Sequence, residues 1–95
     1  MDLAGVTLAT LTPHLQTTFS VDAPGGAGLK LVEATSLGQP YQPGSREPFS
    51  LIFTGEVVLP QRVWLLTHPV LGETEIFLVP IQPEAGCQRY QAIFT

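Results

Sequence analysis

The chain has 95 residues, of which 44% are hydrophobic and only 13% charged, with a formal net charge of −4. Disorder requires low hydrophobicity and high charge, so a mean hydropathy of +0.25 argues for one folded domain over residues 1–95. The four cations, Lys30, Arg46, Arg62 and Arg89, are scattered, which excludes the basic clusters that bind nucleic acid or membrane surfaces.

The N-terminal part predicts little regular structure beyond one helical turn. Residues 3–11 carry a loose helical stripe of apolar side chains. Thr12 followed by Pro13 is typical of a helix N-cap with proline at the first helical position. We therefore expect a short helical turn over residues 13–16.

From Thr17 onward apolar side chains recur at every second residue, which predicts β-strands. Turn-forming residues separate the strands, and Pro80 and Pro83 are expected to end one of them. The predicted strands cover residues 17–22, 29–35, 49–54, 62–68, 73–79 and 88–94, and residues 36–47 form a loop. This spacing indicates an all-β fold, a small and mostly antiparallel six-stranded barrel or sandwich.

Two of these strands are apolar on both faces, although a small antiparallel sheet normally has one face in water. Residues 63–66 read VWLL and residues 76–79 read IFLV. Either both faces are covered by the same chain, or another chain covers one of them. The candidate interface residues are Ile76, Phe77, Leu78, Val79, Trp64 and Arg46. For Trp64, a place in the core is the favoured alternative.

A second group of residues is expected to act structurally. Arg46 and Glu47 are adjacent charges in a charge-poor chain, so an ion pair between them could pin the loop before the strand that begins near Phe49. Pro48 forces Glu47 into an extended conformation. Glu73 and Glu75 share one strand face and are expected to form a solvated acidic edge.

No pattern of residues predicts catalysis, a cofactor or a metal. No serine lies in a Gly-x-Ser-x-Gly motif, and His14 and His68 are expected at turns or rims. Neither histidine has metal-ligand spacing, and the lone Cys87 cannot form an internal disulfide. Residues 25–28 read GGAG but lack the Lys-Ser/Thr ending of a phosphate loop. We therefore expect a protein that is not an enzyme and uses no metal or cofactor.

Several segments together resemble a bacterial family of short proteins known as domain of unknown function 6916. The segments are GSREPFSLIF at 44–53, LPQ at 59–61, HP at 68–69, LG at 71–72, FLVP at 77–80 and YQAIF at 90–94. The family carries no assigned activity, so the resemblance implies no catalytic residues. Its association with phage-tail-type fibre proteins implies a structural or assembly role.

These observations lead to one expected function and one alternative. We expect a structural or protein-interaction module that self-associates or docks on partner chains. The alternative is a small-ligand-binding β-barrel whose pocket is lined by Trp64, Phe77 and Tyr90. The N-terminus has neither the basic region nor the long apolar run of a secretory signal, so the expected location is the cytoplasm, with export inside an assembly left open.

Overall fold

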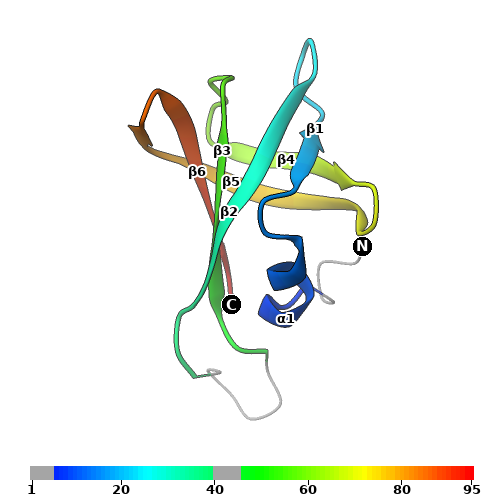
Figure 1. The fold of residues 1–95 in the computed structure, drawn as a ribbon, viewed down its shortest axis with the longest axis vertical. Coiled ribbons are helices and arrows are strands. Elements are labelled where there is room, and N and C mark those ends of the chain that lie inside the picture. Colours follow the sequence, from blue (N-terminus) through cyan, green and yellow to red (C-terminus); the bar gives the residue numbers. More distant parts are fainter. Residues whose placement is uncertain (1–5, 40–45) are drawn as a thin grey trace.

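The computed structural model describes residues 6–39 and 46–95 and contains six strands and two short helices in those ranges (Figure 1). Expectations for residues 3–5 and for the middle of the 36–47 loop lie outside the described residues. The elements are α1 (Leu8–Leu11), η2 (Thr12–His14), β1 (Thr18–Val21), β2 (Ala27–Ser36), β3 (Phe49–Gly55), β4 (Arg62–His68), β5 (Gly72–Glu84) and β6 (Cys87–Phe94).

The strands form a closed barrel in the order β1-β2-β3-β6-β5-β4, and every pairing is antiparallel. The barrel alternative of the expected fold is therefore correct. The barrel closes between β1 and β4, where Ser20 lies opposite Thr67 and Val21 opposite Leu66. Asp22 extends this short contact, because its backbone N–H donates to the Leu65 carbonyl and its Oδ1 accepts from the Leu65 N–H.

The expectation that Pro80 and Pro83 end a strand is wrong, since β5 continues to Glu84. The first part of β5 pairs with β4 up to Leu78, and the part from Val79 onward pairs with β6. After Leu78, one edge of β5 no longer faces a strand. Proline lacks an N–H and is tolerated where that side of a strand needs no partner.

The helical segment begins earlier than the sequence suggests. Thr7 caps α1, because its Oγ1 accepts from the Thr10 N–H, while Thr12 and Pro13 belong to the following 3-10 turn. The short helix packs its apolar side against the barrel core, where Val6 and Leu11 are fully buried. Figure 1 shows α1 beside β2, at one end of the barrel.

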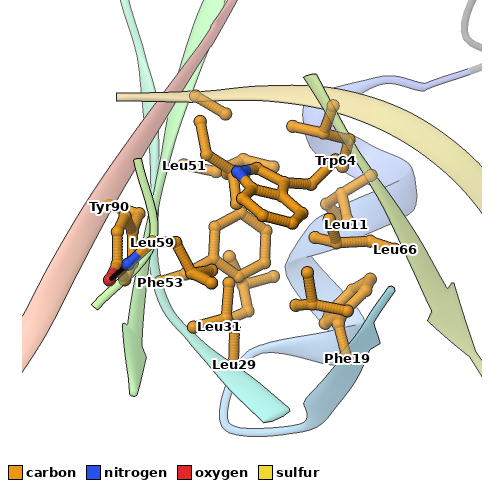
Figure 2. Close-up of a cluster of buried hydrophobic side chains, with 14 of the residues drawn as sticks. Leu11, Phe19, Leu29, Leu31, Leu51, Phe53, Leu59, Trp64, Leu66 and Tyr90 are labelled. Atoms are coloured by element: carbon orange, nitrogen blue, oxygen red, sulfur yellow. Dashed lines mark hydrogen bonds between the residues drawn. The ribbon is translucent and has the colours of Figure 1, made fainter. Parts of the chain in front are cut away.

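The core lies inside the barrel and is built from the inward-pointing half of each strand (Figure 2). Tyr90 is buried there with its hydroxyl satisfied, because the hydroxyl accepts from the Leu59 N–H and donates to the Val57 carbonyl. The rings of Phe19 and Phe53 pack edge to face within this core. The labelled side chains of Figure 2 fill the interior: Leu11, Phe19, Leu29, Leu31, Leu51, Phe53, Leu59, Trp64, Leu66 and Tyr90.

Candidate interaction surface

The outer wall of β4, β5 and β6 carries several exposed apolar side chains. Val63 on β4 lies directly opposite Phe77 on β5, and their exposed fractions are 45% and 49%. Such opposite pairs are neighbours on one sheet face. The two side chains therefore form one apolar patch on the outside of the barrel.

The alternation of side chains along β4 and β5 adds two more apolar residues to this patch. Leu65 and Val79 are half-buried and lie two residues from Val63 and Phe77, so they point to the same side. Ile93 on β6 is 60% exposed between two buried residues. Ile93 lies opposite Ser50 of β3 and outside the β5–β6 pairs. We call the other four residues, Val63, Leu65, Phe77 and Val79, the apolar outer face. Glu73 and Glu75 continue the outward side of β5 as an acidic rim.

The structure separates the interface candidates into inward and outward sets. Ile76, Leu78 and Trp64 are buried in the core of their own chain, so their side chains are not available to a partner. The Trp64 Nε1–H donates to the Pro60 carbonyl, and the Arg62 guanidinium lies 4.1 Å from the indole ring centroid. Of the candidates on these two strands, Phe77 and Val79 remain on the outside.

Arg46 binds chain segments at the end of the barrel instead of pairing with Glu47. Its guanidinium donates to the Val6 carbonyl at 2.8 Å and to the Thr95 carbonyl at 3.1 Å. It also lies 5.5 Å from the centroid of the Phe94 ring.

The expected Arg46–Glu47 ion pair is wrong within the described residues, where the salt bridge found joins Arg89 and Glu84 at 3.4 Å. Adjacent residues of an extended chain point in opposite directions, and Glu47 is exposed. Pro48 and Phe49 are both buried, and the Phe49 ring stacks on Phe94.

His68 lies at the turn between β4 and β5, one of the two positions expected for it, and its side chain is buried. Its Nδ1 accepts from the N–H groups of Val70 at 3.0 Å and Leu71 at 3.2 Å. Nδ1 therefore carries no proton, and the neutral ring carries its proton on Nε2. Nε2 lies 3.1 Å from Thr17 Oγ1, so that hydroxyl accepts from the ring and donates to the His14 carbonyl.

The surroundings of His68 favour the neutral ring. Burial lowers the pKa of His68 from its ordinary value of 6.5, and the neighbouring His14 ring lowers it further. The two histidine rings meet edge to face with centroids 4.8 Å apart. A fully hydrogen-bonded neutral histidine of this kind holds structure together, and the lowered pKa makes its contacts sensitive to acid.

A shallow depression of about 340 Å³ lies on the outside of the barrel, beneath the β5–β6 hairpin. Ile52 forms part of its floor, and Cys87 and Arg89 stand at its side. Cys87 is a free, half-buried thiol. Within the described ranges, no group of three or more His, Cys, Asp or Glu residues is placed to hold a metal ion. No helix in the same ranges is long and apolar enough to cross a membrane.

Comparison with known proteins assigns a family. The family model described as Domain of unknown function (DUF6916) matches residues 6–94. The chain belongs to this family. No match was found among curated proteins or among solved structures. Membership in DUF6916 supports the resemblance seen in the sequence and brings no activity with it.

The candidate interface residues did not include Val63 or Leu65, although strand 63–66 was identified as apolar on both faces, and they did not include the exposed Ile93. The signal for Ile93 was present, because it alternates with Ala92 and Phe94 at the end of β6. If Ala92 and Phe94 point inward, the period of two places Ile93 outside. Val63 could be found in the same way from its neighbour Trp64.

Proposed function

We propose that this DUF6916 domain is a non-enzymatic protein-interaction module of the cytoplasm that self-associates through its apolar outer face. Docking of the same face on a different partner chain is the related form of this proposal. The observation that carries it is the exposed cross-strand pair of Val63 and Phe77. Only 13% of the residues are charged, so few charged side chains are present to keep such a face from associating with another chain.

The energetics support association through this face. Burying one large apolar side chain contributes about 1.5–3 kcal/mol relative to leaving it in water. Val63 and Phe77 are each roughly half exposed, so a second chain could bury most of their surface. The acidic rim of Glu73 and Glu75 would border the contact and limit non-specific pairing, as charged residues do at interface rims.

Replacing Phe77 with Asp tests this proposal directly. We expect the wild-type protein to scatter light as a dimer or larger species and the Phe77→Asp variant to have a mass near 10.2 kDa. The variant should keep its folded spectrum, since Phe77 points outward. Multi-angle light scattering at several concentrations, with circular dichroism in parallel, measures both.

Two matched variants complete the test. Val70→Asp places the same charge on a 74% exposed residue of the β4–β5 turn, outside the face, and should leave the mass unchanged. Leu78→Asp places it in the core and should unfold the domain. A wild-type mass near 10.2 kDa at every concentration would contradict self-association.

The depression beneath the β5–β6 hairpin supports a second candidate function, the binding of a small ligand. Of the three residues expected to line a barrel pocket, Trp64 and Tyr90 are buried among core side chains and Phe77 points outward. A ligand would therefore bind on the outer wall near Ile52. A ligand that raises the melting temperature of the wild type but not of Ile52→Arg would support this candidate.

We extend the main proposal to a structural place in a phage-tail-like or fibre assembly, on the family resemblance alone. An assembly protein of that kind needs repeated contacts between copies or with neighbouring chains. The apolar outer face could supply one such contact. Loss of assembly in cells that carry Phe77→Asp, with the domain still folded, is the expected result.

A further inference from the structure

The N-terminal segment, residues 6–17, covers one end of the barrel and is held at both ends. At its beginning, the Val6 carbonyl accepts from Arg46. At its end, the Thr17 hydroxyl bridges the His14 carbonyl and the His68 ring. Between these points, Leu11 is buried in the core, and Leu8 and Leu15 pack against it. Releasing the segment would therefore uncover apolar core side chains.

We propose that the N-terminal segment is an acid-sensitive cover, and that protonation of His68 detaches its His14 end from the β4–β5 turn. The proposal rests on the hydrogen bonds of His68. A proton on Nδ1 would point at the N–H groups of Val70 and Leu71, so both hydrogen bonds would be lost. Among the described residues, the His68 ring links the turn to the segment, since it bonds the turn through Nδ1 and Thr17 through Nε2.

Within residues 6–39 and 46–95, the side chains shown in contact with the His68 ring are those of His14, Phe19 and Thr17, and none of them carries a negative charge. His14 faces it from η2 in an edge-to-face ring contact, and its electrostatic effect is one cause of the lowered pKa of His68. Phe19 faces it from β1, with ring centroids 4.7 Å apart. Glu73 on β5 lies opposite Thr67, an outward residue next to the inward His68, and so sits on the other side of the wall.

The direction of the pH effect follows from the lowered pKa. In the closed state the pKa of His68 lies below 6.5, and in the detached state the solvated ring returns to about that value. The detached state therefore binds more protons below that pH. Closure is fully favoured above pH 6.5 and weakens as the pH falls toward the lower pKa of the closed state.

Amide hydrogen exchange of the full chain tests the proposal. We expect the opening equilibrium of residues 8–17, corrected for intrinsic exchange, to rise as the pH is lowered from about 7.5 to about 5. The limiting slope is about tenfold per pH unit for each extra proton bound. Amides of β3 and β6 should stay protected over the same range. Equal opening at both pH values, or simultaneous loss of protection in β3 and β6, would overturn the proposal.

Variants and a direct titration keep the test decisive. In His68→Asn the amide oxygen can accept from the Val70 and Leu71 N–H groups but does not titrate, so opening should lose most of its pH dependence. His14→Gln should reduce the acid-induced rise in opening, because His14 is one cause of the lowered pKa of His68. Should His68→Asn fail to fold, an NMR titration of the wild type decides the matter. A His68 pKa at or above 6.5 would refute the proposal.

Discussion

Arg46 shows how a single side chain can matter through backbone carbonyls instead of a neighbouring charge. It donates to residues at both ends of the described chain, Val6 and Thr95, and its guanidinium lies over the Phe94 ring. The sequence drew attention to the correct residue and assigned it the wrong partner. Charge proximity along the chain is visible in a sequence, whereas carbonyls brought near by folding are not.

Replacing Arg46 and Glu47 separately measures this difference. We expect Arg46→Ala to lower the free energy of unfolding by about 1–3 kcal/mol, because the part-buried Val6 carbonyl loses a charged donor. Glu47→Ala should change it by less than about 0.5 kcal/mol, since Glu47 is exposed. Urea denaturation gives both values, and equal losses in the two variants would restore the ion-pair interpretation.

At the scale of the element, the two-residue alternation of apolar side chains predicted the positions of the strands well and the positions of their ends less well. Inward residues such as Phe19 and Leu51 follow from alternation alone. The extension of β5 through Pro80 does not, because it depends on β4 having ended opposite Leu78. The double-sided apolar strand 76–79 identified the outer face, but the choice between its two sides needed the register of the barrel.

Gly55 at the end of β3 offers a test of strand packing. A Cβ there would lie 2.6 Å from Leu29 Cδ2 and 3.0 Å from the Gly28 carbonyl oxygen. We expect Gly55→Ala to destabilise the fold by about 1–3 kcal/mol, because the backbone contact cannot move away as easily as a side chain. Thr54→Ala, at the half-buried neighbouring position, serves as the control. An unchanged thermal midpoint for Gly55→Ala would show that β2 and β3 can separate there at little cost.

At the scale of the whole molecule, stability is expected to come from the apolar core and not from a metal. The buried cluster runs through all six strands and takes in Val6 and Leu11 from the N-terminal segment. In the described ranges no three metal-ligating side chains converge. We expect a strong chelator to leave the melting temperature unchanged in a thermal scan; a drop of several degrees would reveal a structural metal.

The closing contact between β1 and β4 has a consequence for the order of folding. The β4–β5 and β5–β6 pairs join neighbouring strands through short turns, and loops of that length close quickly. The β1–β4 contact instead joins Val21 to Leu66, which are far apart along the chain, through two residue pairs and the Asp22 contacts. Closing the long stretch of chain between these residues costs conformational entropy, and the small contact that forms offsets little of that cost. We therefore expect the curved sheet to form first and the barrel to close last, when β1 pairs with a β4 that is already paired with β5.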